Sequence, residues 1–191
     1  MKLQRVAVLL SAMVAVSLFG QAGAAAPAAG MVGVVDFYAT TPLGPFGFAP
    51  QRFAADDLSK LLTAGAGRFT VVSRDSMERA EASLGWQDVD VLHFDRLRAL
   101  ARAVGANALI VGQILLLDNL DGGRTPPGAS VDANLRLQIF DAAQGRIVAE
   151  TRQSASVVSP LERDLRTKEV LLDALVRAYP RLVDALNTGS L

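Results

Sequence analysis

The chain has 191 residues, with 19 acidic side chains, 19 basic side chains, one histidine and no cysteine. Because the charges balance, no basic excess is available to recruit nucleic acid or an anionic membrane surface. The lack of cysteine excludes disulfide bonds, thiolate catalysis and cysteine metal sites, so hydrophobic packing has to stabilise the fold.

The N-terminus has the pattern of a secretory signal peptide. Lys2 and Arg5 form a basic start, the run Val6–Phe19 carries no charge, and small residues suited to cleavage follow at Ala22–Ala26. A retained membrane anchor is the alternative, although the uncharged run is short for a helix that spans a bilayer. We therefore expect a signal peptide over residues 1–26 and export to the periplasm.

The rest of the chain is long enough for one domain with its own hydrophobic core. We expect a mobile leader over residues 27–31 and a single domain over residues 32–191, with no membrane-spanning segment in the mature chain. The expected strands cover residues 32–37, 69–73, 108–117, 131–139 and 147–157. The expected helices are one that begins at Pro50 and ends at Gly65, one after Asp75, one after Asp95, and a long one over about 160–186.

These elements predict an α/β (α+β) fold in the order β-α-β-α-β-β-β-α, with one or two helices before the third strand. Residues 108–117 have almost no polar side, so this strand should be buried on both faces in the interior of the sheet. Residues 131–139 alternate between apolar and polar, which indicates one wet face. With the turn at Asp141–Gly145, they predict an antiparallel pair. The whole is a mixed sheet of about five strands with helices packed on it.

The long C-terminal helix carries an N-cap motif, an internal proline and an apolar stripe. Ser159 and Glu162 have the spacing of a capping box, with Pro160 in the first turn. Pro180 predicts a kink or a break, which costs about 3 kcal/mol unless packing compensates. The stripe is formed by Leu165, Leu172, Leu175, Val176, Tyr179, Leu182, Val183 and Leu186.

The corner Ser73–Asp75 joins the second strand to a helix and allows two interpretations. It is either a catalytic corner or the start of a helix that Asp75 and Glu78 cap as a capping box. Capping favours the structural interpretation, because no histidine or second nucleophile accompanies the corner.

Four motifs in order resemble the CsgG-like group of bacterial envelope proteins. They are an apolar strand ending in Asp36–Phe37, the segment Arg68–Arg74, the helix-to-strand step Val104–Gly112, and the turn Asp141–Gly145. The same fold group includes the N-terminal domain of TolB and outer-membrane activators of penicillin-binding proteins. Within these motifs Gly105 should end a helix in a left-handed conformation. Gly112, inside a central strand, should permit close approach by a neighbouring element.

The chain also departs from that group. It lacks the cysteine for a lipid anchor, and residues 118–130 are too short and too rich in proline to form the membrane hairpins of a curli-type channel. We also expect neither the propeller of TolB nor the long tether of the synthase activators. The resemblance therefore implies the fold and the periplasmic compartment, but neither secretion nor synthase activation.

No catalytic, metal-binding or cofactor-binding set can be assembled from the sequence. His93 is the single histidine, and Asp88 and Asp90 stand near it, but nothing imposes the geometry of a metal site. No phosphate-binding or nucleophile motif occurs. We therefore expect no cofactor and no enzymatic activity.

The candidate binding residues are Asp36, Tyr38, Phe46, Phe48, Arg74 and Trp86. Asp36 and Arg74 end the first two strands and are predicted to form an ion pair where α/β sheets commonly bind ligands. Alternatively, Asp36 accepts hydrogen bonds from the backbone of the following loop. The aromatic residues suit a protein interface, and the alternative is that Phe46 or Phe48 folds back over the core.

Three functions are compatible with these residues. The favoured one is a non-enzymatic periplasmic module that binds an envelope protein or self-associates in envelope assembly or transport, through its C-terminal helix and aromatic loop. It would associate with the outer membrane only through a partner. The second is a protein that binds a small ligand or a peptidoglycan fragment near Asp36 and Arg74. The third is a carboxylate-based hydrolase, which would need two convergent carboxylates in a cleft, one with a raised pKa.

Overall fold

The computed structural model describes residues 30–40, 43, 46–65, 67–117, 130–158 and 162–188. The strands are β1 (Gly30–Val34), β2 (Tyr38–Ala39), β3 (Phe69–Val71), β4 (Ala108–Leu117), β5 (Ser130–Asp141) and β6 (Arg146–Val158). The helices are α1 (Pro50–Ala64), α2 (Arg74–Leu84), the 3-10 helix η1 (Asp88–Leu92), α3 (Phe94–Val104) and α4 (Arg163–Thr188). The signal peptide expected over 1–26 and the cap motif expected at Ser159 lie outside the described residues.

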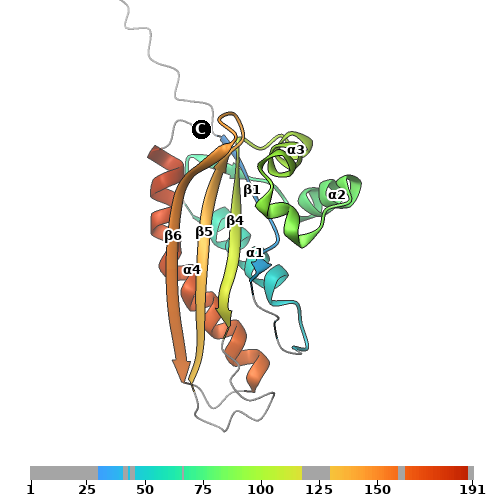
Figure 1. Cartoon of the computed structure of the whole chain (residues 1–191). Helices are drawn as coiled ribbons and strands as arrows, with labels where there is room; N and C mark the ends of the chain where they lie inside the picture. Colours follow the sequence, from blue (N-terminus) through green and yellow to red (C-terminus); the bar gives the residue numbers. More distant parts are fainter. Residues whose placement is uncertain are drawn as a thin grey trace, which may run out of the picture.

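All the strands belong to one mixed sheet, in the order β3-β1-β4-β5-β6 (Figure 1). β1 runs parallel to β3 and β4, whereas β4, β5 and β6 are successively antiparallel. The predicted α/β class, the mixed sheet and the long C-terminal helix are confirmed. The short strand β2 was not predicted; it pairs with β4 where β1 has ended, with Tyr38 beside Gln113.

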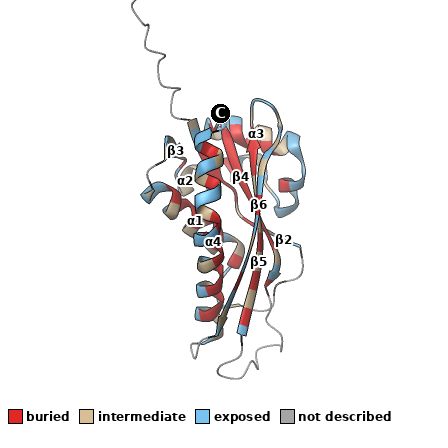
Figure 2. Cartoon of the chain, turned by 90° about the vertical axis from the view of Figure 1, so that its left-hand side faces the viewer, coloured by how far each residue is buried: buried red, intermediate tan, exposed pale blue. Residues whose placement is uncertain are grey.

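Helices cover both faces of the sheet and divide the core into two clusters. On one face, α1 and α4 pack on the sheet around residues such as Leu58, Leu135 and Leu171. On the other face, α2 and α3 bury a second cluster that includes Met77 and Leu97. Figure 2 shows the buried residues gathered along the sheet and on the sides of the helices that face it. β4 lies between the two clusters, which confirms its predicted place in the interior of the sheet.

Two glycines have the structural roles that the sequence predicts. Gly105 ends α3 with a φ of 70°, in the left-handed region where a side chain would be strained. Gly112 lies in β4, and a Cβ atom there would overlap the ring of Phe37. The predicted close approach at Gly112 is therefore confirmed, and Phe37, which follows β1, makes it.

Several boundaries differ from the expectation. α3 begins at Phe94 with His93 as its N-cap, so the cap predicted at Asp95 is wrong. β1 begins at Gly30, so the last two residues assigned to the leader belong to the sheet. α2 begins at Arg74, and its N-cap is Ser73, whose side chain accepts a hydrogen bond from the Ser76 backbone N–H at 3.3 Å. The capping box predicted for Asp75 and Glu78 is therefore wrong, because the helix begins two residues earlier than it requires.

α4 runs without a break through Pro180, so the split that this residue can cause does not occur. Pro180 is exposed, so water can solvate the carbonyl group that loses its helical hydrogen bond. Ala178 and Leu182 on either side of it are buried against the sheet and hold the helix in place.

Candidate functional site

Arg74 is the centre of a charged network at the end of β1. Its guanidinium group forms an ion pair with Asp36, donates a hydrogen bond from Nε to Asp56 at 2.8 Å and donates another to the carbonyl oxygen of Val34 at 2.7 Å. Burial disfavours the charged guanidinium, but the charges of Asp36 and Asp56 outweigh this effect and raise the pKa of Arg74. The predicted ion pair is confirmed. Together with Asp56, it connects the segment after β1 to α1 and α2.

Glu81 in α2 adds a buried carboxyl group to this region. Burial, and after it the negative charge of Asp36, raise the pKa of Glu81 to about 7, although Arg74 opposes the shift. Its Oε1 atom has no hydrogen-bond partner within the described residues. The sequence analysis missed Glu81, although its spacing from Met77 and Leu84, both packed in the second cluster, places it on the buried side of α2.

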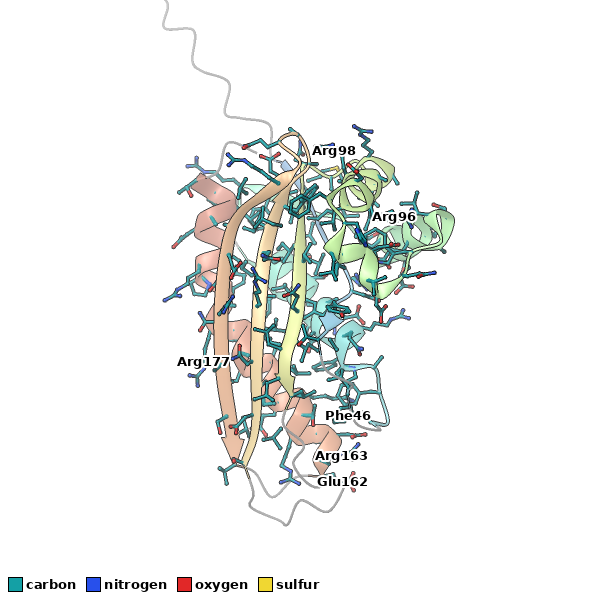
Figure 3. The ribbon with its side chains drawn as sticks, in the orientation of Figure 1. Phe46, Arg96, Arg98, Glu162, Arg163 and Arg177 are labelled. Atoms are coloured by element: carbon teal, nitrogen blue, oxygen red, sulfur yellow. The ribbon has the colours of Figure 1, made fainter. Side chains whose placement is uncertain are left out.

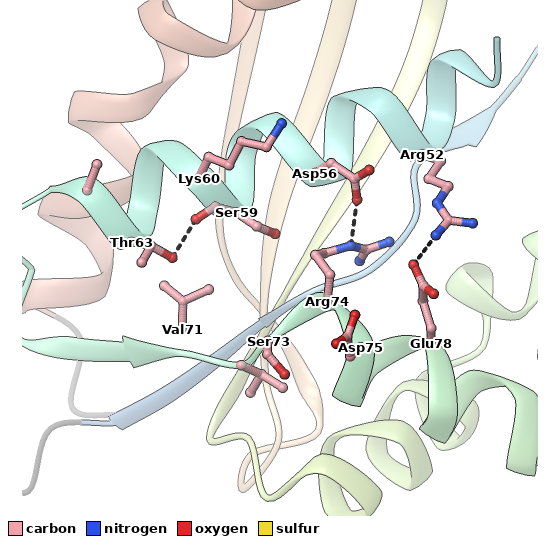
Figure 4. A pocket seen from close by; sticks show the side chains of 12 residues that line it. Arg52, Asp56, Ser59, Lys60, Thr63, Val71, Ser73, Arg74, Asp75 and Glu78 are labelled. Carbon is pink, nitrogen blue, oxygen red and sulfur yellow. Dashed lines mark hydrogen bonds and ion pairs between the residues drawn. The ribbon is translucent and has the colours of Figure 1, made fainter.

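A groove of about 710 Å³ lies between α1 and α2, over the end of β3 (Figure 4). Its walls are formed by Arg52, Asp56, Ser59, Lys60, Thr63, Ala64, Val71, Val72, Ser73, Arg74, Asp75 and Glu78. An ion pair between Arg52 and Glu78 connects the two helices across it. Of the two candidate residues at the strand ends, Arg74 lines the groove, whereas Asp36 is not among its lining residues.

This arrangement bears on the hydrolase interpretation. Two carboxyl groups, Glu81 and Asp36, lie near each other, and one has a raised pKa. However, neither of them is among the residues that line the groove. Asp36 is therefore placed to hold Arg74 rather than to contact a molecule in the groove.

The aromatic loop packs on the start of α4. The rings of Phe46 and Phe48 lie 5.7 Å apart, and Phe46 also packs against the first core cluster. The guanidinium of Arg163 lies 4.8 Å from the ring centre of Phe46, and the ammonium of Lys168 lies 4.7 Å from that of Phe48. Figure 3 shows Phe46 and Arg163 together near the start of α4. Phe46 therefore folds back over the core, as one of the two interpretations expected, whereas Phe48 contacts Phe46, Phe53 and Lys168.

Tyr38 and Trp86 lie away from that loop. Both pack against the second core cluster, on the opposite face of the sheet. The guanidinium of Arg96 lies 5.8 Å from the ring centre of Trp86 and donates a hydrogen bond to Asp90 at 2.8 Å. The six candidate residues are therefore distributed over three regions and form no single site.

The outer side of α4 carries three exposed apolar side chains. Leu165, Leu172 and Val176 are 48%, 40% and 49% exposed, and their spacing of seven and four residues places them on one side of the helix. The opposite side is buried on the sheet through residues such as Leu171 and Leu175. The single stripe that the sequence predicts is therefore two stripes, one in the core and one facing solvent.

The face of β5 and β6 that points away from α4 is polar. Arg136 contacts Glu150 at 2.5 Å, and Arg152 contacts the same carboxylate at 3.2 Å. The hydrogen bond from Arg136 is the main cause that lowers the pKa of Glu150 to about 2. Arg136 and Arg152 thus share one carboxylate, whereas Nε of Arg136 has no hydrogen-bond partner within the described residues.

The remaining candidates for a metal site do not converge. His93 is exposed and precedes α3, and Asp90 is held by Arg96. Across the described ranges, no group of three or more metal-ligating side chains has the geometry to hold an ion. Nor does any helix in those ranges have the length and apolar character to cross a membrane.

The described residues form an α/β domain whose mixed sheet carries helices on both faces, and solved structures share this fold. No protein-family model and no curated protein matches the sequence. The hypothetical protein CT253 of Chlamydia trachomatis is similar at 12% identity and a TM-score of 0.58, covering 85% of this chain and 100% of that one. Lipoprotein GNA1162 of Neisseria meningitidis is similar at 15% identity and a TM-score of 0.54, covering 81% and 98%.

LpoB of Escherichia coli is similar at 19% identity and a TM-score of 0.50. The match covers 71% of this chain but only 59% of LpoB. At these identities, the three similarities show a shared fold alone.

Proposed function

We propose that this chain is a non-enzymatic periplasmic module that binds a protein partner or self-associates in envelope assembly or transport. The observation that carries the proposal is the outer side of α4, where Leu165, Leu172 and Val176 remain exposed. A helix that is apolar on both sides is typically covered on both sides. Burying the remaining surface of each of these side chains would contribute about 1 kcal/mol.

The compartment and the family belong to the same proposal. Residues 1–26 have the pattern of a signal peptide, residues 32–191 are proposed as one domain, and the motifs resemble the CsgG-like and TolB N-terminal group. The shared fold with a lipoprotein of Neisseria meningitidis supports an envelope location. Any association with the outer membrane would then come through the partner.

Site-specific cross-linking in the native bacterium tests this function. A photoreactive residue is placed at Leu172, and a matched one at Val148 in β6, because these two side chains are 40% and 41% exposed. Position 172 should cross-link an envelope protein or a second copy of the chain, and position 148 should not. Equal yields at the two positions, or a product with cytoplasmic proteins alone, would contradict the proposal.

A second candidate function rests on the groove between α1 and α2. Its volume of about 710 Å³ lies within the usual range of small-molecule sites, and Arg74 and Lys60 line it. A peptidoglycan fragment that binds there should raise the melting temperature of the protein. Thr63→Trp, at an exposed position on the groove wall, should abolish that increase; an unchanged increase would place the binding elsewhere.

A further inference from the structure

We propose that the outer side of α4 is covered by α4 of a second copy of this chain, packed antiparallel about a two-fold axis that passes outside α4 at the level of residue 174. The inference rests on the proposed function and specifies its partner. It is argued from the order of side chains along the exposed side of α4 and from the charges beside them. A two-fold contact of this kind uses the same surface on both subunits and therefore closes as a dimer.

The exposed side of α4 is self-complementary when the helix is reversed. Leu172 and Val176 stand at equal distances from Ala174 along the helix. In an antiparallel pair, Leu172 of one subunit therefore faces Val176 of the partner subunit. In the same arrangement Leu165 faces Val183 of the partner subunit, which is half-buried at the edge of the same stripe. Every apolar residue of the stripe then meets another apolar residue.

The charges favour the antiparallel direction over the parallel one. Glu169 is exposed between Leu165 and Leu172, and it has no hydrogen-bond or ion-pair partner in the part of the chain that the structure describes. A parallel pair would place it beside Glu169 of the partner subunit, which is repulsive. An antiparallel pair places Glu169 opposite Tyr179 of the partner subunit. Glu169 then lies within one helical turn of Arg177 of the partner subunit.

Arg177 is the partner that we expect for Glu169, although it also lines a hollow with Ser154 and Ser156 of β6. It is bound to Asp173 of its own helix at 2.8 Å, and its side chain is 55% exposed. Figure 3 shows Arg177 extending from α4 at the edge of the molecule, on the side of β6. In the dimer it would lie between two carboxylates, Asp173 of its own helix and Glu169 of the partner subunit.

The size of the stripe sets the expected strength of the dimer. From Leu165 to Val183 it is about 27 Å long, and a helix is about 10–12 Å wide. Each partner in a standard interface buries about 800 Å². The helix alone presents less than this area, so we expect a reversible dimer whose population rises with protein concentration.

Disulfide cross-linking between mixed variants tests the direction and the register, because the chain has no cysteine of its own. The Leu172→Cys chain and the Val176→Cys chain are prepared separately, then oxidised alone and as an equimolar mixture. The antiparallel pair predicts severalfold more cross-linked dimer in the mixture than in either variant alone, since only the mixed pair brings the two sulfurs opposite each other. A Leu172→Cys chain that cross-links as well alone as in the mixture would overturn the proposed direction.

Sedimentation equilibrium tests the dimer independently. The unmodified chain should dimerise with rising concentration, Val176→Glu should stay monomeric, and Val148→Glu should behave like the unmodified chain. A chain that remains monomeric up to about 1 mM, the weak end of the affinity scale, overturns the inference. If position 172 still cross-links an envelope protein in cells, the proposed function stands and only the second copy as partner is rejected.

Discussion

Arg74 and Asp36 form an ion pair that ties the start of α2 to the segment after β1. The pair is predictable from sequence, because both residues follow strands that run parallel in one sheet and so end at the same edge. Asp56 contributes a second carboxylate from α1. The network therefore joins three elements at one end of the sheet, and its first role is to hold them together.

Replacing Arg74 should destabilise the fold. Arg74→Ala leaves Asp36 and Asp56 without their shared cation, and the partly exposed network should lose about 2 kcal/mol of unfolding free energy. Urea denaturation measures this loss. Arg79→Ala, at an exposed position of the same helix, is the control and should cost less than about 0.5 kcal/mol. Equal losses for both variants would show that the network contributes nothing specific.

Glu81 should make the stability depend on pH. Because the folded protein holds the Glu81 proton more tightly than the unfolded chain, stability is greatest below the ordinary pKa of 4.5 and declines as the pH rises to about 7. Glu81→Gln removes this decline and should stabilise the protein at pH 8 by about 3 kcal/mol, with little effect at pH 4. Denaturant melts at both pH values test this. A variant that is less stable than the parent at pH 8 would mean that neighbouring groups stabilise the charged carboxylate of Glu81 in the folded protein.

Gly112 and Phe37 should be energetically coupled. A methyl group at Gly112 overlaps the Phe37 ring, so Gly112→Ala should cost about 2 kcal/mol. In the double variant Phe37→Leu/Gly112→Ala, the smaller side chain relieves the overlap, and the combined loss should be smaller than the sum of the single losses. Strict additivity would contradict the close approach.

Phe48 should contribute to stability through the loop that folds back on α4. Phe48→Ser removes the ring contacts with Phe46 and Phe53 and the contact with Lys168, and should cost about 2 kcal/mol. Val158→Ser, at a side chain that is 69% exposed, should change stability by less than about 0.5 kcal/mol. Thermal melts compare the two. If Phe48→Ser left the melting temperature unchanged, the Phe48 ring would not be needed for folding and could serve as an interface residue.

The sequence predicts an element correctly where its residue pattern follows directly from how that segment is buried or packed. The uniform apolarity of residues 108–117 indicates burial on both faces, because a strand with one wet face alternates with polar residues. Gly112 within that strand indicates close packing, because a glycine there weakens the strand unless a neighbour needs the space. The Arg74–Asp36 pair follows from strand order alone. The start of α2 was wrong by two residues, since Ser73 and Asp75 are both good N-cap residues and only the backbone distinguishes them.

The sequence could not predict the exposure of individual side chains, because this depends on which neighbouring element covers them. Leu172 and Leu175 are the same residue type in the same helix, yet one is 40% exposed and the other is fully buried. Periodicity shows that a helix has apolar residues, but a stripe wider than one face does not reveal which part meets the sheet. Glu81 was missed for the converse reason, because a glutamate in a helix is usually solvated.

The most direct test of the central claim measures whether the outer side of α4 is covered where the protein works. Leu172→Cys and Val148→Cys are labelled with a thiol-reactive probe, first in dilute purified protein and then in intact cells. The account predicts that position 172 reacts several times more slowly in cells than in dilute solution, while position 148 reacts similarly in both. Equal labelling of position 172 in cells and in dilute solution would show that nothing covers this side of α4.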